Sequence, residues 1–199
     1  MNIFFKIIFY FKKPPLVVVL AQPNSMILEL LSTSMKGWID NSEILLGNKE
    51  LFSELGNKVF LLNISDGKTA LSDVVFLLRR SSMPVLILNE RMADGKLVKE
   101  FSKRGLVIAN NETARLFKED KFDEILISSV GFDDRADLWA SDVNIGEGTN
   151  FKVNHGGDSV PFWIDRRLEE EQITEILLTV RAGMALGLNL VQISQNLKA

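Results

Sequence analysis

The chain of 199 residues contains no cysteine. Disulfides, thiolate nucleophiles and cysteine-ligated metal sites are therefore excluded. The absence of cysteine also fits a reducing compartment, so we expect a cytoplasmic protein. Histidine is almost missing as well, because His155 is the single one. Without a second imidazole or a thiolate beside it, we predict a solvated turn residue and no bound metal.

The sequence has no marked excess of charge. Its formal net charge is -3, and acidic and basic residues are interspersed along the chain and not gathered into a block or stripe. A nucleic-acid partner needs a basic patch or stripe to offset the phosphates. We therefore expect no nucleic-acid binding.

A long hydrophobic run is also absent. The beginning, MNIFFKIIFYFKKPP, is interrupted by Lys6 and closed by Lys12 and Lys13, so it falls far short of the roughly 20 apolar residues of a spanning helix. Its charges follow the apolar run, unlike those of a secretory signal. We expect residues 1–13 to form an apolar helix or arm. We favour a helix packed on the domain; the alternative is a membrane-peripheral helix lying in a membrane surface.

Short apolar runs alternate with helical patterns over most of the chain. Residues 16–21 read LVVVLA, a β-branched run typical of a strand that is covered on both faces. A helical stretch follows it, and the same order recurs with KVFLLNIS, MPVLILNE and GLVIAN. Repeated strand and helix predict a mainly parallel sheet covered by helices, in one α/β domain over residues 14–199.

The alternation of strand and helix patterns stops towards the end of the chain. Four successive stretches read as strands, with turns at Gly146-Glu147-Gly148 and His155-Gly156-Gly157: DEILISSV, DLWASDVNI, NFKVNHGG and SVPFWID. They predict a small antiparallel hairpin extension of the sheet. The last segment, EEEQITEILLTVRAGMALGL, has apolar residues at helical spacing and predicts an amphipathic closing helix.

Taken in order, these elements resemble the central, ATPase-like domain of the Mur ligases, ATP-dependent enzymes that add amino acids or D-Ala-D-Ala to the peptidoglycan precursor. Five stretches carry the resemblance: KKPPLVVVLAQPNSMILELL, KVFLLNISDGKTALSDVVFLL, GLVIANNETARLF, ADLWASDVNIGEGTNFKVNHGGDSVPFWI and ILLTVRAGMALGLNLVQISQNLKA. The resemblance covers residues 12–199 and is closest to the branch that adds D-alanyl-D-alanine. It implies a P-loop NTPase-like fold, without the family's substrate-binding N-terminal domain and its C-terminal ligase domain.

The resemblance also implies a phosphate loop, which needs glycines, a lysine and a Ser or Thr for magnesium. The remnant loop positions are Ala21, Gln22, Asn24, Ser25 and Met26. Ala21 and Asn24 stand near the family's glycines, Ser25 near its lysine and Met26 near its threonine, and Pro23 removes a further N–H donor. We therefore expect neither bound ATP nor bound magnesium.

Other positions that the family uses are also changed. Asn63 stands where the family has a metal-binding glutamate, and Asn111 and Glu112 stand near its nucleotide-proximal aspartates. The segment Asp165-Arg166-Arg167-Leu168 replaces a Gly-(Arg/Lys)-His-Asn segment, so the shared histidine is missing. These changes predict that the chain has no catalytic residue.

Two further motifs have a functional and a structural interpretation. Gly67-Lys68-Thr69 follows a predicted strand and opens a helix, so it is an alternative phosphate site; an ordinary strand-to-helix turn explains it as well. Asp133-Asp134-Arg135 and Asp137 could form a paired-carboxylate site, but solvated or capping aspartates are favoured. We assign Trp38, Trp139 and Trp163 to the core or an interface.

The sequence therefore predicts a non-catalytic Mur-ligase-like domain related to peptidoglycan precursor synthesis. Its role would be protein interaction or regulation, with another protein of cell-wall synthesis as partner. The alternative is an ATP-dependent amide ligase of the D-alanyl-D-alanine-adding type, which needs ATP and magnesium and works with a partner chain. The sequence does not determine the oligomeric state or a substrate.

Overall fold

The computed structural model describes residues 3–21, 25–35, 39–40, 59–64, 71–89, 95–102, 105–119 and 127–198. The strands are β1 (Leu16–Leu20), β2 (Ile39–Asp40), β3 (Val59–Asn63), β4 (Pro84–Leu88), β5 (Leu106–Asn110), β6 (Ile127–Gly131), β7 (Leu138–Ile145), β8 (Thr149–His155) and β9 (Asp158–Ile164). The helices are α1 (Ile3–Lys12), α2 (Ile27–Ser34), α4 (Leu71–Arg80), α5 (Gly95–Ser102), α6 (Asn111–Glu119), α7 (Glu170–Ala185) and α8 (Leu190–Leu197).

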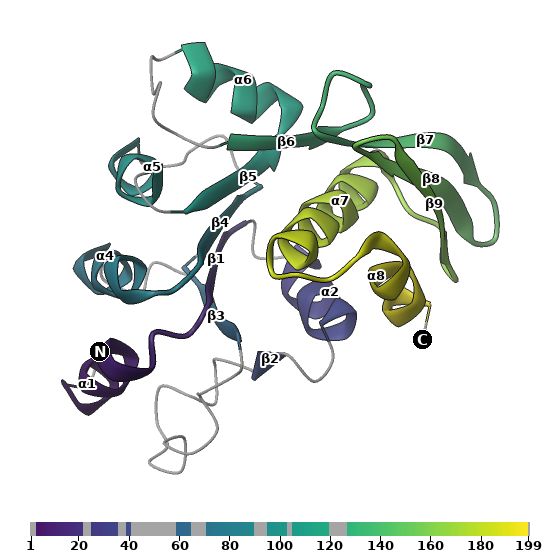
Figure 1. The fold of residues 1–199 in the computed structure, drawn as a ribbon. Coiled ribbons are helices and arrows are strands. Elements are labelled where there is room, and N and C mark those ends of the chain that lie inside the picture. Colours follow the sequence, from purple (N-terminus) through teal and green to yellow (C-terminus); the bar gives the residue numbers. More distant parts are fainter. Residues whose placement is uncertain are drawn as a thin grey trace.

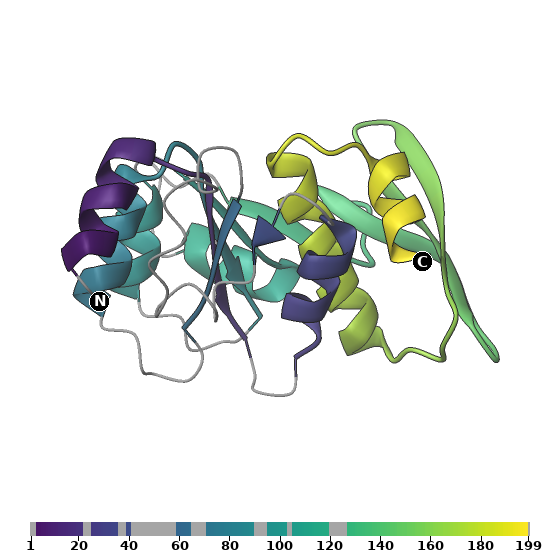
Figure 2. The ribbon, with the colours of Figure 1, turned by 90° about the horizontal axis from the view of Figure 1, so that it is seen from below.

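These strands form one sheet in the order β2-β3-β1-β4-β5-β6-β7-β8-β9, which is parallel from β2 to β7. Figures 1 and 2 show helices on both faces of its parallel part, with α1, α4, α5 and α6 on one face and α2 and α7 on the other. The predicted α/β fold with helices on a mainly parallel sheet is confirmed.

The side chains of β1 show how one strand serves two cores. Val17 and Val19 pack with α2 and α7, whereas Leu16 and Val18 pack with α1, α4 and α5. Successive side chains of a strand point to opposite faces, so a strand with helices on both sides must be apolar throughout. The run LVVVL meets this requirement, and four of its five residues are fully buried.

The predicted antiparallel extension is present as β7, β8 and β9 (Figure 1). Its first predicted strand, DEILISSV, was wrongly included, because it ends in β6, which pairs parallel with β5. β7 also pairs with β6, and this pairing is parallel. Only the two ends overlap, Val130 with Leu138 and Gly131 with Trp139, so residues 132–137 suffice as the connection. Trp163 of β9 is 46% exposed, which excludes the core and leaves an interface as its predicted place. Trp38 lies outside the described residues.

The outer edge of β9 is blocked to further pairing. Gly156 and Gly157 have φ angles of 59° and 94°, the left-handed backbone of a two-residue hairpin turn. The flanking pair of such a turn is hydrogen-bonded, which makes Pro161, opposite Lys152, a non-hydrogen-bonded position. Its missing N–H therefore faces the open edge. The Pro161 carbonyl accepts a 2.8 Å hydrogen bond from Ser194 Oγ of α8, and both features discourage another strand.

The N-terminal residues form a helix that is packed on the domain, the arrangement favoured from sequence. Phe9 of α1 is 1% exposed and meets Phe60 of β3 edge to face. Lys6 Nζ lies 2.6 Å from Asp73 Oδ1 of α4 and 5.4 Å from the centre of the Phe76 ring. Within the described ranges, we find no helix that meets the length and hydrophobicity of a membrane span.

We predict that Phe9→Ala lowers the free energy of unfolding by about 3 to 5 kcal/mol, because a large ring is removed from a closed site. The matched control is Phe11→Ala on the same helix, where the ring is 76% exposed. That change should alter stability by no more than about 0.5 kcal/mol. Urea unfolding of both variants measures the difference. Equal losses would show that α1 is not docked through Phe9.

The ion pair between α1 and α4 predicts a dependence on pH. The hydrogen bond from Lys6 holds the pKa of Asp73 below its ordinary value of 3.8. A carboxyl with a lowered folded-state pKa stabilises the fold above its unfolded-state pKa, and this contribution is lost as the pH falls through the folded-state value. Asp73→Asn should therefore be less stable than the parent at neutral pH and approach it in strong acid. A constant difference in urea unfolding across this range would contradict the pair's role.

Candidate functional site

The carboxyl edge of the parallel strands is the place where open α/β sheets bind ligands. The chain leaves β1 towards α2 on one face and leaves β4 towards α5 on the other. β1 and β4 are neighbours in the sheet, so a crevice is expected where the two connections diverge. The remnant phosphate loop predicted from sequence follows β1 and therefore borders this crevice.

Of the remnant loop, the structure describes Ala21, Ser25 and Met26; Gln22 and Asn24 lie outside the described residues. Ala21 is buried. Ser25 Oγ accepts a 3.2 Å hydrogen bond from the backbone N–H of Ile27, so this hydroxyl serves the first turn of α2. The side chains that replace the family's lysine and threonine thus supply no positive charge here.

A carboxylate of the chain itself lies at the start of α2. Glu175 of α7 is 5% exposed, and its Oε2 accepts a 2.9 Å hydrogen bond from the backbone N–H of Met26. Its other oxygen, Oε1, accepts a 2.8 Å hydrogen bond from Asn89 Nδ2, directly after β4. Glu175 therefore bridges the two sides of the predicted crevice. It also places a carboxylate at a helix N-terminus, the position that phosphate groups take in nucleotide-binding folds.

Sequence reasoning missed Glu175. The closing helix was correctly predicted, and its apolar residues Ile173, Ile176, Leu177 and Val180 are all fully buried. The available signal was the carboxylate between them, since Glu is almost never fully buried without a partner. That signal does not identify the partner, because Met26 is 149 positions away in the sequence.

The segment before α7 reaches the same place. Arg166 Nη2 lies 3.8 Å from Met26 Sδ, so the stretch from Asp165 to Leu168 approaches the remnant loop. Arg166 is exposed and contacts the thioether of Met26. Arg166 therefore places a cation beside the start of α2.

The other positions that the resemblance singles out also lie at the carboxyl edge of the parallel strands. Asn63 ends β3, opposite Val19 in the neighbouring strand β1. Asn111 and Glu112 begin α6 after β5, which is two strand spacings, or roughly 10 Å, from β1. The Cβ of Asn111 faces Gly131 of β6, away from β4. Asn111 and Glu112 are therefore separated from the remnant loop by β4, whereas Asn63 lies on the strand next to β1.

The described residues do not fit a magnesium-bound nucleoside triphosphate. The N–H of Met26, a donor that a phosphate would use, is already bonded to the Glu175 carboxylate, and Ser25 stands where the resemblance implies a lysine. No group of three potential metal-binding side chains occurs within the described ranges. The alternative site, Gly67, Lys68 and Thr69, lies outside them.

The aspartates before β7 have separate roles. Asp133 is bonded to Arg135, whose guanidinium holds the pKa of Asp133 well below its usual range. Asp137 Oδ2 accepts hydrogen bonds from Ser129 N and Oγ, at 2.7 and 3.1 Å, which ties the start of β7 to β6. His155 Nδ1 lies 2.6 Å from the backbone oxygen of Asp137. Asp133 and Asp137 therefore have separate partners, Arg135 and Ser129.

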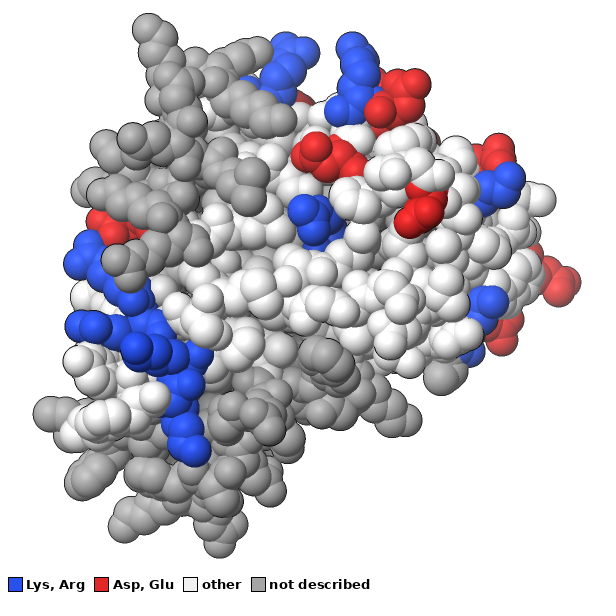
Figure 3. Space-filling model, viewed as in Figure 1, with Lys and Arg blue, Asp and Glu red and all other residues white. Residues whose placement is uncertain are grey.

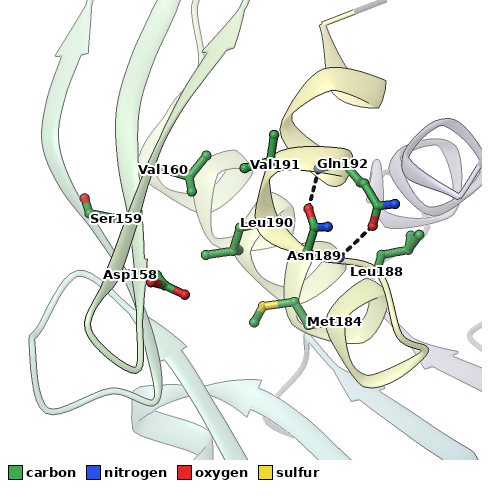
Figure 4. A pocket seen from close by; sticks show the side chains of 9 residues that line it. All are labelled: Asp158, Ser159, Val160, Met184, Leu188, Asn189, Leu190, Val191 and Gln192. Carbon is green, nitrogen blue, oxygen red and sulfur yellow. Dashed lines mark hydrogen bonds between the residues drawn. The ribbon is translucent and has the colours of Figure 1, made fainter.

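A groove of about 600 Å³ lies between β9 and the turn that joins α7 to α8 (Figure 4). Asn189 Oδ1 accepts from Gln192 N and Gln192 Oε1 accepts from Asn189 N, so these two amides cap α8. The remaining lining is mostly apolar: Val160, Met184, Leu188, Leu190 and Val191, with Asp158 and Ser159 at one end. Met184 lies nine residues after Glu175 on α7, about 14 Å along a helix. The groove is thus separate from the strand edge and lacks a cation for a nucleotide.

We predict that Glu175→Gln destabilises the protein by about 1 to 3 kcal/mol, because an amide can accept only one of the two hydrogen bonds and leaves a donor facing a donor. Glu171→Gln, an exposed position one turn earlier on α7, is the matched control and should change stability by no more than about 0.5 kcal/mol. Chemical denaturation measures both. Equal stability of the two variants would mean that Glu175 does not bridge α7, α2 and β4.

No family model and no curated protein sequence matches the chain. Solved structures do. MurF from Acinetobacter baumannii has a TM-score of 0.64 at 13% identity, over 95% of this chain and 46% of that one. MurF ligase from Thermotoga maritima, in complex with ADP, has a TM-score of 0.64 at 12% identity, over 95% and 50%.

A pseudomurein peptide ligase type C from Methanothermus fervidus has a TM-score of 0.65 at 12% identity, over 96% of this chain and 50% of that one. The chain therefore spans about half the length of these three structures. At such low identity the likeness shows the fold alone. The fold of this chain is the one found within Mur-type peptide ligases.

Proposed function

We propose that this chain is a non-catalytic relative of the Mur ligases, with a protein-interaction or regulatory role in peptidoglycan precursor synthesis. One observation carries the proposal: the Glu175 carboxylate is bonded to the N–H of Met26 at the start of α2. The partial positive charge of a helix N-terminus is what draws phosphate to this point in nucleotide-binding folds. In this chain a carboxylate already satisfies it.

The carboxylate also opposes an incoming phosphate. Two like unit charges 4 Å apart repel by about 1 kcal/mol in water and by about 4 kcal/mol near a protein surface. A phosphate at the Met26 N–H would meet this repulsion or would have to displace Glu175. Displacement would leave the Asn89 amide without its carboxylate and would break a buried bridge. Either route weakens nucleotide binding.

The replaced side chains support the same proposal. Phosphoryl transfer depends on positioning and on neutralising the charge of the transferring group, which the family's loop lysine and metal ligand supply. Ser25, Met26 and Asn63 carry no charge. The losses act on the same transferring group, so they compound. The D-alanyl-D-alanine-adding branch remains our proposal for the nearest relatives, supported by the order of the sequence stretches that resemble it.

A second candidate is an ATP-dependent amide ligase of that branch, acting with a partner chain. It is favoured by the likeness over 95% of this chain to a ligase in complex with ADP, which is about twice as long. In this case ATP and magnesium would be cofactors, with Arg166 beside Met26 as a cation near the phosphates.

Calorimetric titration with Mg-ATP tests the two candidates. For the non-catalytic domain we expect no saturable heat and no thermal stabilisation at millimolar nucleotide, in the parent and in the Lys68→Ala variant alike. Saturable binding by the parent would contradict this proposal and support the ligase. If Lys68→Ala abolished such binding, the phosphate site would lie at Gly67-Lys68-Thr69; if Arg166→Gln abolished it, the site would lie at the start of α2.

A further inference from the structure

Helix α1 has a second apolar face, which points away from the domain. Phe9 is directed into the core, whereas Ile7, Tyr10 and Phe11 are 48%, 43% and 76% exposed. The spacing of these three residues places them on one side of a helix. The rings of Tyr10 and Phe11 meet edge to face with their centres 5.4 Å apart. We call Ile7, Tyr10 and Phe11 the outer stripe.

Positive charge lies at the end of the outer stripe and against one of its rings. Lys12 and Lys13 follow it directly and are exposed, and the guanidinium of Arg80 from α4 lies 4.5 Å from the centre of the Tyr10 ring. Lys6 is paired with Asp73, and Arg79 is paired with Glu100. Among the described residues, Lys12, Lys13 and Arg80 have no such carboxylate partner. Figure 3 shows Lys and Arg gathered on the side of the molecule that α1 and α4 form in Figure 1.

We propose that this face of α1 docks on an anionic lipid surface, with the outer stripe at the boundary of headgroups and acyl chains and Lys12, Lys13 and Arg80 among the headgroups. Exposed aromatic and aliphatic residues beside basic ones are the pattern of a helix that lies in the plane of a membrane. The helix is held on the domain through Phe9 and Lys6. It therefore presents its outer stripe without refolding.

The charges select this occupant over a second copy of the chain. Two copies meeting through α1 would bring Lys12, Lys13 and Arg80 close to the same residues of the other copy, and like charges repel. Anionic headgroups offer the complementary charge, and each Lys or Arg near such a surface adds to the attraction. The proposal concerns the opposite side of the sheet from Glu175, so it stands or falls independently of the proposed function.

Vesicle flotation with the full chain tests the proposal. The probes are vesicles of phosphatidylcholine alone and of phosphatidylcholine mixed with phosphatidylglycerol. We expect binding to the anionic vesicles, weak binding to the neutral ones, and a loss of binding as salt is raised from about 0.1 to about 0.5 M. Absence of binding to the anionic vesicles, or equal binding to both that salt does not change, would overturn the proposal.

Matched variants locate the contact. Phe11→Ser and the double variant Lys12→Gln/Lys13→Gln should each reduce partitioning on the order of tenfold. The controls are Trp163→Ser, an exposed aromatic residue on β9, and Lys152→Gln/Lys198→Gln, which changes the net charge equally; both should bind as the parent does. All variants should unfold at the parent's temperature. Equal losses in the test and control variants would overturn the proposal.

Light scattering tests whether a second copy of the chain covers the outer stripe instead of lipid. The chain should not form a dimer through α1, so Phe11→Ser should leave its mass in solution unchanged. A dimer of the parent that Phe11→Ser dissociates, without any binding to anionic vesicles, would assign the outer stripe to a second copy and overturn the proposal.

Discussion

The buried bridge made by Glu175 sets how the closing helix sits against the rest of the domain. Apolar contacts hold α7 on the sheet and on α2, but such contacts are not directional. The two hydrogen bonds of Glu175, to Met26 N and to Asn89 Nδ2, fix α7 along its axis and join it to α2 and to the end of β4. A buried carboxylate without both donors would destabilise the fold, so the three elements constrain one another.

The same bridge gives the carboxyl edge its chemical character. Asparagine ends or follows three of the parallel strands, at Asn63, Asn89 and Asn110. Asn110 accepts a hydrogen bond from the N–H of Thr113 and so serves the first turn of α6. Asn89 is bonded to Glu175. Side chains at this edge thus satisfy the backbone and one another. A sheet can keep the fold of a ligase in this way, because topology depends on the apolar pattern and chemistry depends on a few polar groups.

The sequence predicted most of the fold because its strongest signals are local. Runs such as LVVVL are apolar on both faces of the strand, so both faces must be buried. The glycine pair after His155 permits a two-residue hairpin turn. The parallel pairing of β7 with β6 was not predicted, because it depends on the overlap of two strand ends and leaves no pattern in the composition. The sequence left Trp163 between the core and an interface for a related reason: alternation along an edge strand does not show which face is covered.

The candidate site could be predicted only in part. The positions of Ser25, Met26 and Asn63 followed from their order along the chain, and Met26 and Arg166 do lie together. Glu175 could not be placed, since its partners are 149 and 86 positions away and the helical spacing of its neighbours says nothing about them. Contacts between distant segments are set by packing of the whole domain. That is why the replaced residues of the remnant phosphate loop could be recognised in the sequence, whereas the contact of Glu175 with this loop could not.

The backbone amide of Met26 is the most direct reporter of the central claim. Its resonance can be followed in nitrogen-15-labelled protein during a titration with Mg-ADP or inorganic pyrophosphate. The account predicts a resonance that stays in place at millimolar ligand, and that moves when Glu175 is replaced by Gln because the acceptor has changed. A saturable shift of the Met26 amide in the parent protein would show that phosphate reaches the start of α2, and it would contradict the account.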